Sequence, residues 1–527
     1  MEELELYDTT LRDGTQQEGI SLSVDDKLKI TRKLDELGVH FIEGGWPGSN
    51  PKDIEYFKKV KSIKLSKATI TAFGSTRKAN VQVEKDSNIQ ALKKADTSVV
   101  TIVGKSWDLH VKKLLETSLE ENLLMIHDSI AYLKAQGRRV FFDAEHFFDG
   151  FSDNPDYAIQ VVKKAFEAGA ERIILCDTNG GSIPSLVQEI VSKIKYETAA
   201  VLGIHTHNDT ELAVANAMVA IQSGVKQVQG TINGYGERCG NANLISLIGN
   251  LKIKWGIDCV SEEQLSKLTE ISRYISEVAN MPPSGFQPYV GVSAFSHKGG
   301  LHASGITKVE ASYQHIPPER VGNIKRIVIS ELSGRSNILH KLKELGLSDL
   351  VPKEEAPKIL DMIKIQESKG FQYEGAEASF ELMVRRLLPN YNPSFELIDY
   401  MVVIEKDRRS SSSEHDGILS EATVKVRVAS DMVHTVAEGN GPVNALDNAL
   451  RKSLVQFYPN IESIRLVDFK VRVVDQGTGT GAIVRVLIES TDGERVWSTV
   501  GSSGNVIEAS WFALADSLEY YIYKHKV

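Results

Sequence analysis

The segment Ala200-Val201-Leu202-Gly203-Ile204-His205-Thr206-His207 decides the fold that we predict. Its short apolar run is typical of a buried β-strand, and the run ends in two histidines. On an extended strand, residues i and i+2 project from the same face, with Cα atoms about 6.5–7 Å apart. Both imidazoles can then reach one metal ion, because a metal such as zinc binds nitrogen at about 2.0–2.1 Å. The segment therefore predicts a strand whose end can ligate a metal.

The same pattern of an apolar run with a polar end recurs along the N-terminal half. Including the segment above, the runs are Leu4–Tyr7, Phe41–Glu43, Ala68–Phe73, Ser98–Val103, Arg139–Phe142, Arg172–Cys176, Ala200–Ile204 and Gln227–Ile232. Helical patterns such as Val24–Leu37 and Pro155–Ala168 separate them, with Gly38 and Gly169 placed as caps. Eight such strands and helices in roughly 260 residues predict a (β/α)₈ TIM barrel. A doubly wound open sheet is the alternative, but no glycine-rich dinucleotide fingerprint follows the first run.

Nearly every run ends in an ionisable or hydrogen-bonding side chain. These residues are Asp8, Glu43, Lys105, Asp143, Glu145, Asp177, Thr178, His205, His207 and Asn233. Active sites of this barrel form at the C-terminal ends of its strands. We therefore expect these side chains to meet at one mouth.

A metal centre is the first site that this arrangement predicts. Asp13, after the first run, adds an oxygen ligand to His205 and His207, and Asn241 can add its amide oxygen. Such a mixed set of donors suits Mn²⁺, Mg²⁺ or Zn²⁺. The same set could serve a non-haem Fe(II) oxygenase, but Arg12 would then have no evident role. A cation beside a metal ion predicts instead that an anionic substrate binds between them.

A 2-oxo acid fits this prediction, because its carboxylate and keto oxygen can chelate a metal together. Thr178 could hold the distal carboxylate oxygen, and Glu145 could orient a base or a water; Glu145 could also simply pair with Arg12. Outside the barrel, Phe295–Gly305 contains His302, a candidate general acid or base. Tyr313 could donate a hydrogen bond to developing oxyanion charge.

The chain divides into three predicted regions. Residues 1–265 form the barrel, residues 266–394 form helical linker subdomains that carry the histidine loop, and residues 395–527 form an α+β domain. This last region contains an internal repeat, since Thr435-Val436 with Ala445, Ala449, Leu450 and Leu454 recurs 64 residues later as Thr499-Val500 with Ala509, Ala513, Leu514 and Leu518. We expect two strand–strand–helix units that sense a ligand or dimerise. Residues 407–417, with four consecutive serines, are expected to form a hairpin loop.

The composition narrows the class of protein. A net charge of −9 argues against a general nucleic-acid or anionic-membrane binder. No apolar run approaches the 18 or more residues of a transmembrane helix. The sequence begins without a signal-peptide pattern, and Cys176, Cys239 and Cys259 form no Cys-x-x-Cys pair. A soluble cytoplasmic protein is expected.

Three motifs together resemble the 2-isopropylmalate, homocitrate and citramalate synthases. They are residues 8–16, the His-x-His strand end and the Gly-x-Gly-Glu-Arg-x-Gly-Asn segment at 234–241. The resemblance implies a metal-dependent barrel enzyme that condenses acetyl-CoA with a 2-oxo acid, and it extends to a regulatory tail. Residues 41–51 and 142–150 are most similar to the citramalate branch, which implies pyruvate as substrate. The histidine loop departs from the isopropylmalate pattern.

The resemblance also implies roles for individual residues. The metal ligands would be Asp13, His205, His207 and Asn241. Arg12 would stabilise the enolate, Thr178 and Glu145 would lie in the substrate site, and His302 would be a catalytic histidine contributed by the partner subunit of a homodimer, with Tyr313 nearby. Isoleucine is the effector implied for a citramalate route. The alternatives are a synthase that uses 2-oxoisovalerate and is regulated by leucine, and a non-catalytic sensor of 2-oxo acids.

Overall fold

A computed structural model describes residues 4–299, 302, 305–306, 309–330, 333–406, 418–474 and 479–525. The chain forms two compact units. The first comprises Met1–Phe295 and Ile316–Lys325, and the second comprises Ser296–His315 and Arg326–Val527. Each unit is described by itself below.

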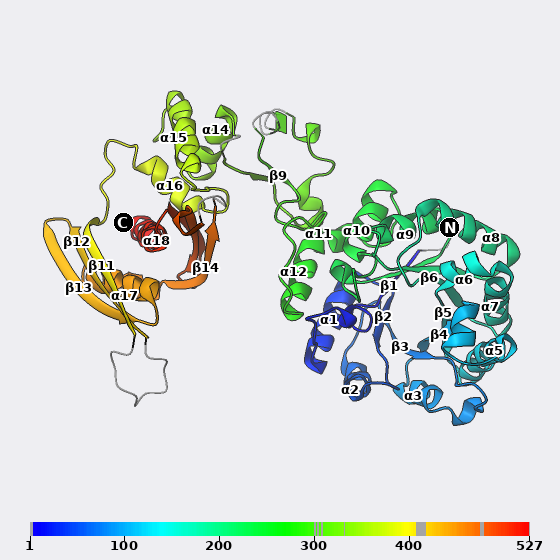
Figure 1. Cartoon of the computed structure of the whole chain (residues 1–527). Coiled ribbons are helices and arrows are strands. Elements are labelled where there is room, and N and C mark those ends of the chain that lie inside the picture. Colours follow the sequence, from blue (N-terminus) through cyan, green and yellow to red (C-terminus); the bar gives the residue numbers. More distant parts are fainter. Residues whose placement is uncertain are drawn as a thin grey trace. The chain divides into compact units, whose positions relative to one another are not determined.

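The first unit is built on a closed barrel of eight parallel strands (Figure 1). The strands are β1 (Glu5–Asp8), β2 (Phe41–Gly45), β3 (Thr69–Ser75), β4 (Val99–Lys105), β5 (Arg139–Glu145), β6 (Arg172–Asp177), β7 (Leu202–Thr206) and β8 (Gln227–Gly230). They neighbour one another in sequence order, and β8 pairs with β1 to close the barrel. The predicted TIM barrel is confirmed.

Helices lie between successive strands or follow the last strand, and they lie around the outside of the barrel (Figure 1). They are α1 (Val24–Leu37), α2 (Pro51–Lys59), α3 (Ser87–Ala95), α4 (Asp108–Lys113), α5 (Leu119–Ala135), α6 (Phe147–Asp153), α7 (Pro155–Glu167), α8 (Pro184–Glu197), α9 (Ala213–Gln222), α10 (Leu244–Gly249), α11 (Glu262–Ser266) and α12 (Leu268–Val278). Helix α1 begins at a capping box of Ser23 and Asp26 and ends at Gly38, whose φ of 88° suits glycine. Local capping thus fixes the helix that follows the first strand.

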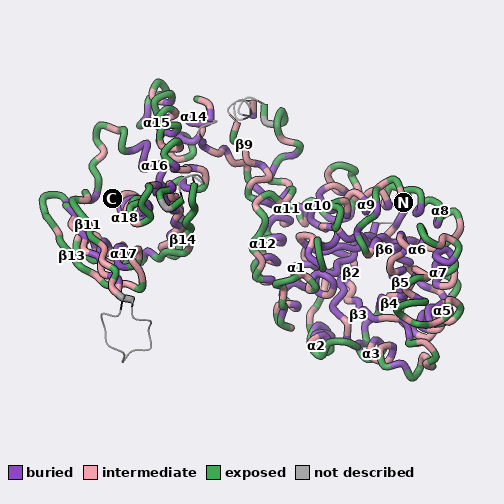
Figure 2. The backbone as a smooth tube through the Cα atoms, viewed as in Figure 1, coloured by how far each residue is buried: buried purple, intermediate pink, exposed green. Residues whose placement is uncertain are grey.

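Large side chains fill part of the barrel interior. Tyr7, Phe41 and Phe141 pack against one another inside the barrel. The rings of Phe41 and Phe141 meet edge to face, with their centroids 5.0 Å apart. Between strands and helices lies a larger apolar core, and Figure 2 shows burial along the strands. Helix α12 packs into this same core through residues such as Ile271 and Ile275. The predicted boundary at residue 265 stays a prediction.

The second unit contains a helical part and a two-part α+β tail. The short strands β9 (Ser296–His297) and β10 (Arg326–Ile327) pair in parallel, and the helices are α14 (Arg335–Glu344), α15 (Ala356–Ser368) and α16 (Glu377–Arg385). These helices share a core that includes Ile338, Ile359 and Phe380. Val500 of the tail joins this core, so the helical part and the tail pack together.

The tail consists of two copies of one unit. The first copy is β11 (Glu396–Lys406), β12 (Ile418–Val428), β13 (Asp431–Gly439) and α17 (Pro442–Leu454). The second is β14 (Arg465–Val473), β15 (Val484–Thr491), β16 (Val496–Ser503) and α18 (Val506–His525). Each copy is a three-stranded antiparallel sheet followed by a helix, so the expectation of two strands per unit is wrong: β11 and β14 each lead a unit.

The predicted repeat corresponds to a shared hydrogen bond. The Thr435 hydroxyl donates to the Ala449 carbonyl at 2.8 Å, and the Thr499 hydroxyl donates to the Ala513 carbonyl at 2.7 Å. In both copies a threonine on the third strand thus ties that strand to the helix that follows. The expected hairpin loop at 407–417 lies outside the described residues. Within the described part of the chain, no helix is long and apolar enough to cross a membrane.

Candidate metal centre and substrate cavity

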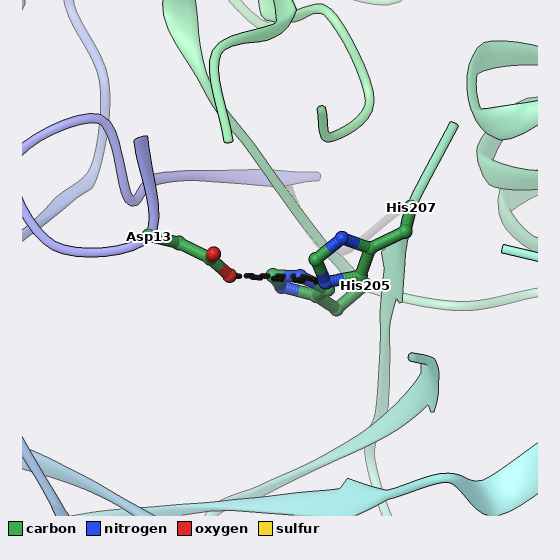
Figure 3. A group of neighbouring side chains, drawn as sticks. All are labelled: Asp13, His205 and His207. Carbon is green, nitrogen blue, oxygen red and sulfur yellow. Dashed lines mark hydrogen bonds and ion pairs between the residues drawn. The ribbon is translucent and has the colours of Figure 1, made fainter. Parts of the chain in front are cut away.

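Asp13, His205 and His207 meet at the mouth of the barrel. Asp13 follows β1, His205 lies in β7, and His207 comes directly after β7. The Asp13 Oδ2 atom lies 3.3 Å from His205 Nε2 and 3.9 Å from His207 Nε2, and the two Nε2 atoms are 3.3 Å apart (Figure 3). All three side chains are buried, with exposed fractions of 3%, 5% and 6%. One oxygen and two nitrogens thus point toward a single small volume, as a metal centre requires.

The environment of this cluster favours the metal-binding forms of Asp13 and His207. Burial raises the pKa of Asp13, but Arg12 and His205 outweigh it and hold that pKa well below its ordinary value. Burial and the neighbouring His205 lower the pKa of His207 to about 3. Burial also lowers the pKa of His205, but Asp13 outweighs it and raises that pKa. An ionised carboxylate and a neutral imidazole are the forms that bind a metal.

Asn241 lies beside the cluster in a glycine-rich loop. An isolated antiparallel bridge pairs Asn241 with His207, and the Asn241 Nδ2 atom donates to the Tyr235 carbonyl at 3.1 Å. Its Oδ1 atom is buried and has no hydrogen-bond partner among the described residues. A Cβ atom at Gly236, whose φ is 153°, would come within 2.2 Å of Asn241 Nδ2. Glycine at 236 therefore leaves room for the Asn241 side chain, and one carboxylate, two imidazoles and an unpaired amide oxygen are donor types that suit a divalent metal.

Arg12 is held over the cluster by a buried carboxylate. Its Nε atom donates to Glu43 Oε2 at 2.6 Å, its Nη1 atom lies 3.3 Å from Asp13 Oδ2, and its guanidinium sits 3.8 Å above the centre of the Phe73 ring. Burial opposes its charge, but Glu43 and Asp13 outweigh it and raise the pKa of Arg12. Glu43 therefore already balances the charge of Arg12, so an anionic substrate does not follow from that charge alone.

A cavity of ≈ 540 Å³ opens above these residues. It is lined by Arg12, Asp13, His205 and His207, and also by Phe73, Arg77, Lys105, Asp143, Glu145, Thr178 and Arg238. The Thr178 hydroxyl accepts a hydrogen bond from the His146 backbone N–H at 2.8 Å, which leaves its own proton for a ligand. Glu145 pairs with Lys105, so its suggested pairing with Arg12 is wrong.

His302 and Tyr313 belong to the second compact unit. Their rings stack with centroids 4.5 Å apart, and both residues are exposed. The structure therefore brings this pair together, but it does not place the pair within the barrel cluster.

Sequence reasoning assigned no role to three supporting residues. Glu43 holds Arg12, and its other oxygen accepts a hydrogen bond from the Tyr7 hydroxyl at 2.7 Å. Gln229 contacts His205, and Asp143 contacts Gln229. Glu43 and Asp143 stood out as polar strand ends, but Gln229, inside a short strand, carried no such signal.

Matches to known protein families and to known relatives cover almost the whole chain. The HMGL-like family matches residues 3–275, the homocitrate synthase post-HMGL domain-like family matches residues 289–370, and the LeuA allosteric (dimerisation) domain matches residues 374–522. The (R)-citramalate synthase of Geobacter sulfurreducens is 53% identical, covering 99% of this chain and 98% of the relative. That of Aquifex aeolicus is 52% identical, with the same coverage. A 2-isopropylmalate synthase of Methanocaldococcus jannaschii is 33% identical over 99% of this chain and 95% of the relative.

Proposed function

We infer the reaction from one premise: the chain belongs to the (R)-citramalate synthase family, whose barrel is HMGL-like. The chain is an acyltransferase that condenses acetyl-CoA with pyruvate and hydrolyses the thioester, giving (R)-citramalate and CoA for isoleucine biosynthesis. Relatives named 2-isopropylmalate synthase are more distant, which favours pyruvate over 2-oxoisovalerate. The observation that carries this function is a buried Asp-His-His cluster with an arginine over it at the floor of one cavity.

Asp13, His205, His207 and Asn241 would hold a divalent metal ion, of which Mn²⁺, Mg²⁺ and Zn²⁺ all suit the ligand set. When bound, such an ion polarises the keto group of the 2-oxo acid as a Lewis acid. The unpaired Oδ1 atom of Asn241 and the ionised Asp13 support this assignment. The chain's own residues supply the remaining steps.

Binding of pyruvate involves Thr178 and Arg12. The Thr178 hydroxyl proton can be donated to a carboxylate oxygen of the substrate, since its oxygen is already held by His146. Arg12, fixed by Glu43, presents positive charge to the thioester oxygen, where negative charge develops when the acetyl methyl loses a proton. This stabilisation is strong because the guanidinium is largely shielded from water, with an exposed side-chain fraction of 13%.

Proton transfer is assigned to Glu145, His302 and Tyr313. A base takes one proton from the acetyl methyl, and the resulting carbon forms a bond to the keto carbon of pyruvate while the keto C=O π bond opens and its oxygen takes up a proton. Glu145 lines the cavity beside Lys105 and can orient a base or a water. His302 acts as the acid or base, supplied by the partner subunit of a homodimer, and Tyr313 stacks on it. Water then cleaves the thioester and releases CoA.

The tail is proposed to bind isoleucine as the end-product effector. It holds a cavity of ≈ 440 Å³ in which Asp447 and Arg451, paired at 2.9 Å, stand among the apolar residues Ile461 and Ile464. A charge pair with apolar walls complements a zwitterion with a branched side chain. The match of residues 374–522 to the LeuA allosteric (dimerisation) domain also supports a homodimer. We also propose that the protein is located in the cytoplasm.

Thiol release from acetyl-CoA, measured on the full-length chain with Mn²⁺, tests the proposed reaction. We expect release with pyruvate, and its loss in Asp13→Asn, which removes a ligand charge at constant volume. Asp258→Asn is the matched control, since the Asp258 side chain is 89% exposed and is not among the residues that line the cavity. Absence of release in the wild type would favour a non-catalytic sensor, and equal activity in Asp13→Asn would exclude the metal assignment.

Hydrogen exchange on the full-length chain tests the effector. Isoleucine should protect residues 442–466, and Asp447→Asn should weaken this protection while leaving thiol release without isoleucine unchanged. Protection by leucine in preference to isoleucine would support the 2-isopropylmalate alternative.

A further inference from the structure

A chain of hydrogen bonds crosses the barrel interior beneath the metal cluster. The Nδ1 atom of His205 lies 2.9 Å from Oε1 of Gln229, and Nε2 of Gln229 donates to Oδ1 of Asp143 at 3.3 Å. His205 and Gln229 are register partners on the paired strands β7 and β8, whereas Asp143 comes from β5. All three are buried, with exposed fractions of 5%, 0% and 4%. Water therefore cannot replace these contacts without entering the core.

The chemistry of the three groups fixes the direction of each hydrogen bond. The amide NH₂ group of Gln229 faces Asp143, so this group donates and the carboxyl oxygen Oδ1 of Asp143 accepts. The carbonyl oxygen of that amide then faces His205, and this oxygen can only accept. The proton of neutral His205 must consequently reside on Nδ1, which leaves the Nε2 lone pair directed at Asp13 Oδ2, 3.3 Å away.

We infer that Gln229, anchored by Asp143, is a positioning residue that selects the metal-binding tautomer and ring orientation of His205. The inference rests on the proposed function, in which His205 is a metal ligand. Histidine ligands characteristically donate their second ring N–H to a fixed acceptor, and that acceptor commonly raises metal affinity. An amide fulfils this role here without adding a negative charge next to Glu43 and Asp143.

His207 provides an internal contrast. Its Nδ1 atom is buried and has no hydrogen-bond partner among the described residues. No acceptor among the described residues thus holds a proton on the Nδ1 atom of His207, although the ring lies in the same cluster. Of the two imidazoles, His205 is the one that the protein orients before a metal arrives, and Gln229 is the residue that does so.

Mn²⁺ binding in the absence of substrates tests this role, with free Mn²⁺ measured by electron paramagnetic resonance. Gln229→Met keeps the side-chain length and removes both hydrogen bonds, and it should raise the Kd by about 10–100-fold. Gln229→Glu retains an acceptor for the His205 Nδ1–H and should restore most of the affinity. Gln229→Leu repeats the first comparison if Gln229→Met does not fold, as judged by circular dichroism.

The outcomes separate this inference from the proposed function. If His205→Ala binds Mn²⁺ as the wild type does, the metal centre itself is wrong. If His205→Ala loses binding but Gln229→Met keeps the wild-type Kd, only the positioning role is wrong. Equal weakening in Gln229→Met and Gln229→Glu would also overturn it, because packing rather than the acceptor would then control affinity.

Discussion

Removing the guanidinium of Arg12 should affect catalysis and folding through two different contacts. Its positive charge faces the cavity, so Arg12→Ala should lower turnover by about 10²–10³-fold, the cost of one oxyanion-stabilising group. The same change leaves Glu43, which is fully buried, without its cation. Loss of one partner of a buried ion pair costs about 3–5 kcal/mol of stability. The two effects must therefore be measured separately.

A double variant separates them. Arg12→Ala combined with Glu43→Gln removes the unpaired charge while Tyr7 can still donate to the amide oxygen, so stability should largely return. Turnover should not return, because the cation over the cavity is still absent. The assays are thermal unfolding and thiol release with saturating pyruvate and acetyl-CoA. Recovery of turnover together with stability, or near wild-type turnover in a folded Arg12→Ala enzyme, would refute the catalytic role of Arg12.

Three further predictions concern residues that line the same cavity. Mn²⁺ at about 100 times its Kd should raise the free energy of unfolding by about 2.7 kcal/mol, and Asp13→Asn should abolish this increase in a thermal-shift titration. The pKa of His207, lowered to about 3, lies below its unfolded value of about 6.5, so the unfolded chain binds the extra proton between these values. Within this window His207 should therefore add up to about 1.4 kcal/mol per pH unit to the slope of stability against pH for the metal-free protein, and His207→Gln should lower the slope by that amount in urea titrations; an unchanged slope would contradict the assignment. The pKa of His205 is raised, so this residue stabilises the folded protein below its unfolded pKa. That contribution is lost as the pH rises through the folded pKa. Thr178→Val should raise the KM for pyruvate about 10-fold with a smaller change in kcat, and an unchanged KM would place the substrate carboxylate elsewhere.

The sequence predicted the barrel and the metal cluster because both depend on position along the chain. An apolar run marks each strand, and a polar residue at its C-terminal end must lie at the mouth of the barrel. The sequence alone therefore predicts that Asp13, His205 and His207 lie close together. The partner of Arg12 could not be predicted, since Glu43 and Glu145 both end strands and only side-chain geometry selects Glu43.

The tail shows a second limit of sequence reasoning. Its repeat was visible, but the leading strands β11 and β14 were not recognised. Each contains a register shift, between Leu397 and Asp399 and between Leu466 and Asp468. A bulge breaks the alternation of inward and outward side chains on which strand recognition depends.

The ratio of kcat/KM for pyruvate to kcat/KM for 2-oxoisovalerate tests the central claim most directly. It is measured by thiol release from acetyl-CoA on the full-length chain with Mn²⁺, and the product is identified by chiral chromatography. We predict a ratio of at least about 10, since each additional methyl group shifts selectivity by about 1–3 kcal/mol, with (R)-citramalate as the product. A ratio below one, with 2-isopropylmalate as the main product, would contradict the account.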